Sequence, residues 1–185
     1  MQPTTDTPEF LSPVLAPAAP APGAALVLTD ESAMTKMVVR AKAGTLARGA
    51  LAQPFAGSRT GAGVVVAGTR PDEWMLLGPA EAVSARLADV PTEGHVSFVD
   101  WTHGRAQFRL TGDVATSALE KVSGLDWSEA MMPNGAVTSG SVAKVTCDLI
   151  RNDVDGTPSY LILCDRSFGQ YLYDAILDSM SEFVT

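Results

Sequence analysis

The residues best suited to chemistry gather in residues 99–113, VDWTHGRAQFRLTGD. His103 lies in a Thr-His-Gly turn, and an imidazole that titrates near neutral pH can act as a general acid or base. Arg105 and Arg109 follow on alternating positions of a strand-like run, so both guanidinium groups share one face of the strand. A planar guanidinium grips a carboxylate with paired hydrogen bonds. The stretch therefore raises two possibilities, an acid–base centre or a surface that binds an acidic group.

The surroundings of His103 argue against an acid–base centre. Asp100 and Asp126 are the other groups near turns that could move a proton, yet the sequence shows no nucleophile–base pair. A single histidine in a turn is usually an exposed turn residue, and arginines on a polar strand face are either solvated or bound to an acidic partner. Tryptophan is common both in cores and at subunit interfaces. We assign no catalytic residue, and the residues alone leave Trp101, His103, Arg105 and Arg109 open as exposed or core side chains or as contacts to a partner.

The sequence carries no recognisable motif for a metal or a nucleotide cofactor. A structural zinc site needs about four Cys or His ligands in paired spacing, whereas Cys147, Cys164 and the two histidines stand alone. The glycines of GSRTGAGVVVAG precede a strand, while those of a dinucleotide-binding loop follow a strand and open a helix. The Walker A and Gly-x-Ser-x-Gly patterns are also absent. We expect no metal or cofactor site in this chain.

The composition is that of an acidic chain with few cysteines. Of the 185 residues, 13 are Lys or Arg and 21 are Asp or Glu, which gives a net charge of -8. This balance argues against nucleic acid and against an anionic membrane surface as partners, because both attract clustered basic residues. No apolar run approaches the ~20 residues that span a bilayer. Both cysteines lie in apolar runs typical of buried thiols in a reducing compartment, so we expect a cytoplasmic protein.

The first 24 residues differ from the rest of the chain. They are rich in Pro and Ala and have no periodicity, so they cannot bury enough apolar area to offset the entropy of ordering. A basic n-region is missing and prolines interrupt any apolar core, which excludes a secretory signal. We expect residues 1–24 to be a tail that is either disordered or an extended arm on a neighbouring subunit, and residues 25–185 to form a single α+β domain.

From residue 63 onward the chain repeats a strand–strand–helix plan three times. Each unit has two apolar or alternating runs around a turn signal, followed by a stretch with helical periodicity. The expected hairpins pair residues 63–68 with 73–78, 96–101 with 105–111, and 141–151 with 159–165; the expected helices cover residues 79–90, the segment after an Asp113 N-cap, and residues 167–183. Antiparallel hairpins covered by helices define an α+β fold rather than a doubly wound parallel sheet.

The segment from residue 26 to residue 55 gives weaker signals. A short apolar LVL and the run MTKMVV are followed by the alanine-rich TLARGALAQPF. We expect a loop-like entry to the domain, with one short helix near residues 45–52.

The run VDWTHGRAQFRLTGDVATSALEKVSGLDW, residues 99–127, resembles the gamma subunit of heterotetrameric sarcosine oxidases. In that family an Asp, a Ser/Thr-His-Gly-Arg turn, an alternating strand that ends in Gly, a short helix and a Leu-Asp pair recur in this order. RPDEWMLLGP upstream, and SVAKVTCDLIRND and SYLILCDRSFGQYLYDAI downstream, are similar to the same family. The resemblance covers roughly residues 63–183; residues 26–60 and the Pro/Ala tail show little that aligns. The related folate-binding proteins of iron–sulfur maintenance are excluded, because their Lys-Gly-Cys-x-x-Gly-Gln-Glu motif is absent.

The resemblance implies an aminomethyltransferase-like, folate-binding-type fold in a four-chain complex. Such a complex oxidatively demethylates sarcosine to glycine and passes one-carbon units to tetrahydrofolate. FAD, FMN, NAD and tetrahydrofolate are then expected on the larger alpha and beta chains and zinc on the delta chain, while the gamma chain packs on alpha without catalytic residues. Its role would be assembly and stabilisation of the flavoprotein chain. The predicted hairpin around His103 would then be mainly architecture, and its contact residues to the partner chain would be Trp101, His103, Arg105 and Arg109. Two alternatives stay open: a stand-alone folate-binding or one-carbon transfer module, and the equivalent subunit of another secondary-amine oxidase.

Overall fold

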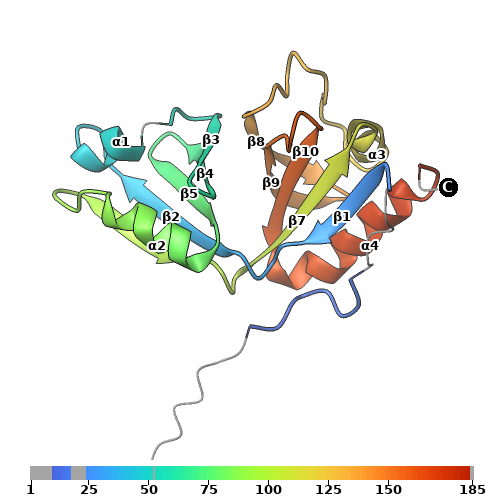
Figure 1. Cartoon of the computed structure of the whole chain (residues 1–185), viewed down its shortest axis with the longest axis horizontal. Coiled ribbons are helices and arrows are strands. Elements are labelled where there is room, and N and C mark those ends of the chain that lie inside the picture. Colours follow the sequence, from blue (N-terminus) through green and yellow to red (C-terminus); the bar gives the residue numbers. More distant parts are fainter. Residues whose placement is uncertain (1–9, 18–23, 52, 184–185) are drawn as a thin grey trace, which may run out of the picture.

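The computed structural model describes residues 10–17, 24–51 and 53–183, which form two five-stranded antiparallel sheets (Figure 1). In spatial order, sheet A consists of β1 (Leu26–Asp30), β7 (Arg105–Gly112), β10 (Ser159–Asp165), β9 (Val145–Arg151) and β8 (Val137–Val142). Sheet B consists of β3 (Ser58–Gly61), β4 (Val64–Arg70), β5 (Glu73–Gly78), β2 (Thr35–Ala41) and β6 (Val96–Asp100). The helical segments are α1 (Leu46–Leu51), α2 (Ala80–Ala88), α3 (Ala115–Glu120), the 3-10 turn η1 (Arg166–Phe168) and α4 (Gly169–Met180).

The two sheets pack face to face, and helices cover their outer faces. Val38 and Met75 of sheet B share an apolar cluster with Ile150 and Leu161 of sheet A. The outer face of sheet A packs against α3 and α4, and the outer face of sheet B packs against α1 and α2. Because side chains alternate along a strand, each sheet contributes one set of apolar residues to the middle layer and another to its helices. The molecule is therefore a four-layer structure of helices, sheet, sheet and helices.

Strand β7 shows how the sequence pattern sets the layers. Ala106, Phe108 and Leu110 are fully buried beneath the helices of sheet A, and the Phe108 ring meets the Tyr173 ring of α4 edge-on at 5.4 Å. Burial of a side chain the size of Phe108 or Leu110 contributes on the order of 1.5–3 kcal/mol. The predicted division of this strand into an apolar face and a polar face is confirmed.

Several of the predicted elements are present. The β4–β5 hairpin is followed by α2, the β9–β10 pair is followed by α4, and α1 occupies the place expected for a short helix. All strand ladders in the two sheets are antiparallel, which confirms the α+β class. Among the described residues, no helix has the length and apolar character needed to cross a membrane.

The predicted hairpin around the Thr-His-Gly turn is wrong. Strand β6 pairs with β2 in sheet B, whereas β7 lies between β1 and β10 in sheet A. Residues 101–104 therefore carry the chain from one sheet to the other. The physical reason is burial: β7 has a continuous apolar face that needs two neighbours and helices above it, whereas β6 is mostly exposed and lies at an edge.

Three smaller expectations also need correction. The segment expected as a loop-like entry contains two strands, β1 and β2, one in each sheet. The run expected as a single strand at residues 141–151 is split by a turn at Ala143 and Lys144, whose φ values are 47° and 67°, and the preceding strand β8 was not anticipated. Asp113 does not cap α3, because Val114 holds the N-cap position without a side-chain cap bond.

Residues 10–17 pack on the chain itself. Val14 is buried in the cluster beneath α4, the Leu15 N–H donates to Gln170 Oε1 at 2.8 Å, and the Ser12 hydroxyl donates to Asp30. Val14 thus finds apolar partners within its own chain, and the expectation of a tail that is disordered or an arm on a neighbouring subunit stays a prediction. The rest of the expected tail, apart from residue 24, lies outside the described residues.

Candidate functional site

The predicted contact residues surround the place where the chain crosses twice between the sheets. Residues 31–34 lead from β1 in sheet A to β2 in sheet B, and residues 101–104 lead back from β6 to β7. These two connections, which we call the crossover, run side by side at the lower centre of the molecule (Figure 1). Hydrogen bonds from the strands that follow hold the two connections together. The Lys36 N–H of β2 donates to Thr102 Oγ1 at 3.1 Å, and the Gln107 N–H of β7 donates to Ser32 Oγ at 3.1 Å.

Lys36 is the buried centre of the crossover. Its Nζ donates to the backbone oxygens of Ser32 and Met34 at 2.8 Å and of Thr102 at 3.4 Å. Burial lowers the pKa of this amine from 10.5 to about 8, against the opposing effect of nearby carboxylates. The group is therefore still an ammonium ion at neutral pH, and its charge holds both connections. The sequence analysis did not single out this residue; a lysine within an apolar strand run was the available signal.

Arg105 is bound to two carboxylates of its own chain. One NH2 group donates to Asp148 at 2.6 Å and the other donates to Asp165 at 2.9 Å. The side chains of Arg105 and Asp148 are only 15% and 8% exposed, while that of Asp165 is 68% exposed. Asp148 also accepts a hydrogen bond from Ser139 at 2.8 Å. Arg105 can bind carboxylates, as expected of a guanidinium group, but the two that it binds belong to sheet A of its own chain.

Arg109 has a similar network at the other end of β7. Its Nε donates to Glu31 Oε1 at 2.6 Å, and a terminal nitrogen donates to the hydroxyl of Ser159 at 3.1 Å. Glu31 also accepts a hydrogen bond from the Gln107 amide at 3.0 Å. Arg109 and Glu31 are 19% and 16% exposed, so this pair lies largely within the protein. The polar face of β7 is thus a set of internal ion pairs.

Trp101 and His103 lie at the surface edge of the crossover. The Trp101 ring lies beneath the guanidinium of Arg105, 5.6 Å from its carbon, and is partly buried. His103 is exposed, and its ring lies 5.3 Å from that of Phe10 in the N-terminal segment. Asp100, at the end of β6, accepts a hydrogen bond from the Thr102 N–H at 2.8 Å; hydrogen bonding to Thr102 holds the pKa of that carboxyl below its usual value. The structure thus brings three predicted contact residues together, while Arg109 lies further along β7.

Both cysteines are buried and free. Cys147 and Cys164 lie in the cluster between sheet A and its helices. Burial raises the pKa of the Cys147 thiol to about 12 and that of the Cys164 thiol to about 11. Neither group is a thiolate at neutral pH, so neither has the reactive form that nucleophilic or metal chemistry requires. In the described part of the chain, no three His, Cys, Asp or Glu side chains gather as a metal site would require.

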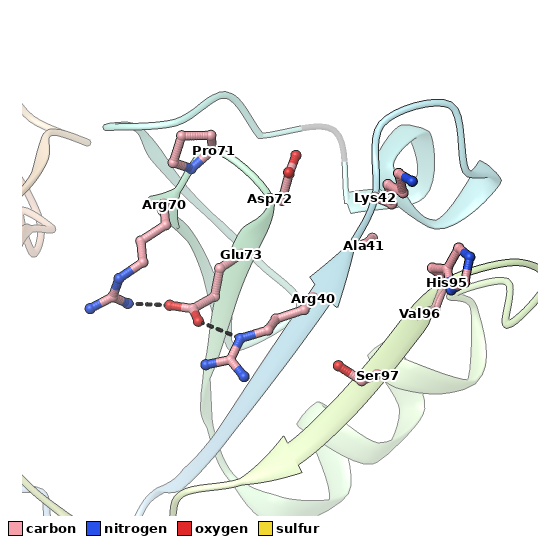
Figure 2. Close-up of a pocket in the computed structure, with 10 residues that line it drawn as sticks. All are labelled: Arg40, Ala41, Lys42, Arg70, Pro71, Asp72, Glu73, His95, Val96 and Ser97. Atoms are coloured by element: carbon pink, nitrogen blue, oxygen red, sulfur yellow. Dashed lines mark hydrogen bonds and ion pairs between the residues drawn. The ribbon is translucent and has the colours of Figure 1, made fainter.

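A pocket that the sequence analysis did not anticipate lies at one end of sheet B. We call it the Glu73 pocket; its volume is about 660 Å³ and it is lined by Arg40, Ala41, Lys42, Arg70, Pro71, Asp72, Glu73, His95, Val96 and Ser97. These residues come from the end of β2, the β4–β5 turn and the start of β6. Figure 2 shows Arg40 and Arg70 reaching the Glu73 carboxylate from opposite sides.

The Glu73 carboxylate is the buried anchor of this pocket. Its side chain is 5% exposed, and it accepts hydrogen bonds from Arg40 Nε at 2.8 Å, from Arg70, and from the Thr69 hydroxyl at 3.0 Å. Burial by itself would raise the pKa of Glu73, but the hydrogen bonds from Arg40, Arg70 and Thr69 outweigh it and hold the pKa below its usual value. Glu73 is therefore ionised at neutral pH.

Two solved structures share this arrangement of sheets and helices. A chain of the heterotetrameric sarcosine oxidase from Corynebacterium sp. U-96, in complex with pyrrole 2-carboxylate, superimposes with a TM-score of 0.72 at 22% identity, covering 86% of this chain and 86% of that chain. The glycine cleavage system aminomethyltransferase T from Bartonella henselae gives a TM-score of 0.65 at 17% identity, covering 83% of this chain and 46% of that chain. This chain thus spans about half the length of the aminomethyltransferase. The fold is of the class shared by these two proteins, as predicted.

The sequence places the chain within that class. The model of the family described as sarcosine oxidase, gamma subunit, matches residues 47–182. No curated protein sequence is significantly similar to the chain. The chain belongs to the sarcosine oxidase gamma subunit family, which confirms the resemblance stated from its motifs.

Proposed function

We propose that this chain is the gamma subunit of a heterotetrameric sarcosine oxidase and that it assembles and stabilises the larger flavoprotein chain. The observation that carries this proposal is the family match over residues 47–182. The shared fold with a chain of a heterotetrameric sarcosine oxidase supports it. The complex would oxidatively demethylate sarcosine to glycine and pass the one-carbon unit to tetrahydrofolate.

The chemistry of the described residues favours a structural role for this chain over a catalytic one. Arg105 and Arg109, the side chains best suited to hold an acidic substrate, are neutralised by Asp148 and Glu31. The two thiols have raised pKa values. Electrostatic catalysis depends on donors that point to where charge develops on a substrate. The guanidinium donors of Arg105 and Arg109 point instead to carboxylates of their own chain.

The cofactors of the reaction would lie on the partner chains. We place FAD, FMN, NAD and tetrahydrofolate on the alpha and beta chains and zinc on the delta chain, with alpha as the direct neighbour of this subunit. We also place the complex in the cytoplasm, because two free buried thiols fit a reducing compartment. The partner would be neither a nucleic acid nor a membrane, given the net charge of -8.

The crossover is one surface through which the chain could contact the alpha chain. Trp101 and His103 present aromatic groups at its surface edge, and aromatic residues are enriched at subunit interfaces. Arg105 and Arg109 would contribute to the same contact mainly by shaping it, because their charges are already paired.

Co-purification tests the proposed function. A tagged full-length chain, co-expressed with the alpha, beta and delta chains, should retain them and show a flavin absorbance spectrum. The isolated chain should show neither flavin absorbance nor oxidation of sarcosine. Turnover of sarcosine by the isolated chain would refute the proposal.

A further inference from the structure

The Glu73 pocket has an excess of positive charge on an otherwise acidic chain. Arg40 and Arg70 share the single carboxylate of Glu73, and Lys42 lines the same pocket. The other acidic group of the pocket, Asp72, forms an ion pair with Arg48. The pocket therefore keeps about two uncompensated positive charges, in a protein whose net charge is -8.

Two arginines of sheet A show the opposite balance. Arg105 and Arg151 each bind two carboxylates, Asp148 with Asp165 and Glu129 with Asp153. At Glu73 the ratio is reversed, because two guanidinium groups divide one carboxylate. A further carboxylate would give the two arginines of the Glu73 pocket one carboxylate each, the ratio found at the Arg109–Glu31 pair.

Donors remain available for such a carboxylate. Within the described residues, Arg40 bonds to Glu73 through its Nε, which leaves its two terminal NH2 groups for another acceptor. Arg70 bonds through one terminal nitrogen. The two side chains are 54% and 55% exposed, and Figure 2 shows their guanidinium groups on either side of the Glu73 carboxylate. Guanidinium groups with free parallel N–H donors bind carboxylates in bidentate geometry.

The exposure of these groups favours a side chain of another protein over a free small molecule. Pockets for small ligands usually bury most of the ligand surface, whereas half of each arginine here faces solvent. Partly exposed charges of this kind are typical of the polar rim of a protein interface. Both arginines are bonded to the buried Glu73 carboxylate. Their N–H donors are therefore ordered before a partner arrives, which lowers the entropic cost of binding.

We propose that the Glu73 pocket receives an aspartate or glutamate side chain of the alpha chain. This inference rests on the proposed function, because it takes the partner to be the larger chain of the oxidase. The docking surface would then include the Glu73 pocket, a part of sheet B that is separate from the crossover.

Charge reversal at Lys42 tests the proposal, because Lys42 is exposed and its substitution leaves the Glu73 ion pairs intact. The matched control is Lys144→Glu, which makes the same change on the exposed β8–β9 turn of sheet A. The affinity of each variant for the co-expressed alpha, beta and delta chains is measured at about 50 mM and about 300 mM salt, since screening weakens exposed ion pairs. Lys42→Glu should bind about tenfold more weakly at the lower salt, and less so at the higher salt, while Lys144→Glu binds as wild type.

A second variant and a chemical cross-link sharpen the result. Arg70→Gln keeps the Arg40–Glu73 pair and should also weaken binding about tenfold. A carbodiimide, which joins an amine directly to a neighbouring carboxylate, should link Lys42 in the assembled complex to an Asp or Glu of the alpha chain, identified by mass spectrometry. The unfolding midpoint of the isolated Lys42→Glu chain should equal that of wild type, which separates lost binding from lost folding.

The outcomes distinguish this inference from the proposed function. If the wild-type chain fails to assemble with the flavoprotein chains, the proposed function is wrong. If it assembles, and both Lys42→Glu and Arg70→Gln bind as wild type, only the inference about the pocket is overturned. Titration of the isolated chain with free glutamate or inorganic phosphate gives a further check: tight binding that Arg70→Gln abolishes, with assembly unchanged, would show a small-anion site and would also overturn the proposal.

Discussion

Arg105 provides a comparison of two ion pairs on one guanidinium group. Asp148 and Asp165 both bind it, at 2.6 and 2.9 Å, but their side chains are 8% and 68% exposed. Removal of one partner of a buried pair leaves an uncompensated charge in the interior and costs about 3–5 kcal/mol. An exposed pair contributes at most about 1 kcal/mol. The two carboxylates should therefore differ strongly in their effect on stability.

We expect Asp148→Asn to lower the free energy of unfolding by about 3 kcal/mol, because Asp165 still offers Arg105 one carboxylate. This corresponds to a fall in Tm of roughly 6–12 °C for a chain of this length. Asp165→Asn should cost less than about 1 kcal/mol. Urea unfolding of the purified full-length chain, followed by tryptophan fluorescence, measures both values and shows through a constant m-value that the unfolded state is unchanged.

A double variant completes the test. Replacement of a buried ion pair by apolar side chains is often neutral or stabilising, so Arg105→Met combined with Asp148→Leu should recover much of the stability that either single change loses. Equal costs for Asp148→Asn and Asp165→Asn would refute the reasoning, since burial would then not determine the strength of the pairs. A destabilised Arg105 variant would also show that this residue supports the fold before it contacts any partner.

Three further predictions concern the crossover, the sheet and the ligand. The pKa of Lys36 is about 8 in the folded chain and 10.5 when unfolded, so between these values this group binds more protons in the unfolded state and adds on the order of 3 kcal/mol to stability as pH rises. The two buried thiols, whose pKa values are raised from 9.0 in the folded chain, act in the opposite direction above about pH 9. The stability of wild type minus that of Lys36→Met should therefore rise in urea unfolding from about pH 7.5 to about 10.5, and a constant difference would contradict the assignment. Gly112→Ala should cost about 1–3 kcal/mol, because its Cβ would lie 2.2 Å from the Ala25 carbonyl oxygen at a φ of 151°, while Gly124→Ala, which meets no atom within 4 Å, should stay close to wild type in the same assay. Calorimetric titration of the isolated chain with tetrahydrofolate should show no micromolar binding, and a clear micromolar isotherm would favour a stand-alone folate-binding module instead.

Local pattern predicted the elements of this fold better than their pairing. The alternation of Ala106, Phe108 and Leu110 identified β7 and its two faces, because a strand buried on one side must place apolar residues at every second position. The same alternation says nothing about which strand lies beside it. The short Thr-His-Gly turn suggested a hairpin, whereas the chain changes sheets there. Strand partners depend on tertiary burial, which is not encoded within a few neighbouring residues.

The missed strand β8 illustrates a second limit. Its sequence, VTSGSV, is small and polar, and only its two terminal valines are buried. A Cβ at Gly140 would lie 2.7 Å from the Leu125 side chain, so Leu125 would have to shift to admit a larger residue there. Such a strand forms because β9 offers it a complete hydrogen-bonding edge, not because its own residues prefer strand conformation.

The residues of the candidate sites come together only through the pairing of distant strands, so the sequence predicted these sites only in part. Sequence reasoning named carboxylate binding as one possibility for Arg105 and Arg109, but the carboxylates that they bind lie 43, 60 and 78 positions away in the chain. The Glu73 pocket gathers residues from three separate segments between residues 40 and 97. No spacing in the sequence links these segments, because only the order of strands in sheet B brings them together.

The distribution of ion pairs indicates how an acidic subunit can dock on a partner with a defined orientation. A chain with a net charge of -8 as a whole repels acidic groups of a partner. The arginines of β7 cannot offset this repulsion, because carboxylates of the same chain already neutralise them. The Glu73 pocket can, because two arginines share one carboxylate and keep free donors at the surface. An acidic side chain of the alpha chain would thus be attracted at this end of sheet B, and the attraction would fix the orientation of the subunit before the apolar and aromatic contacts form.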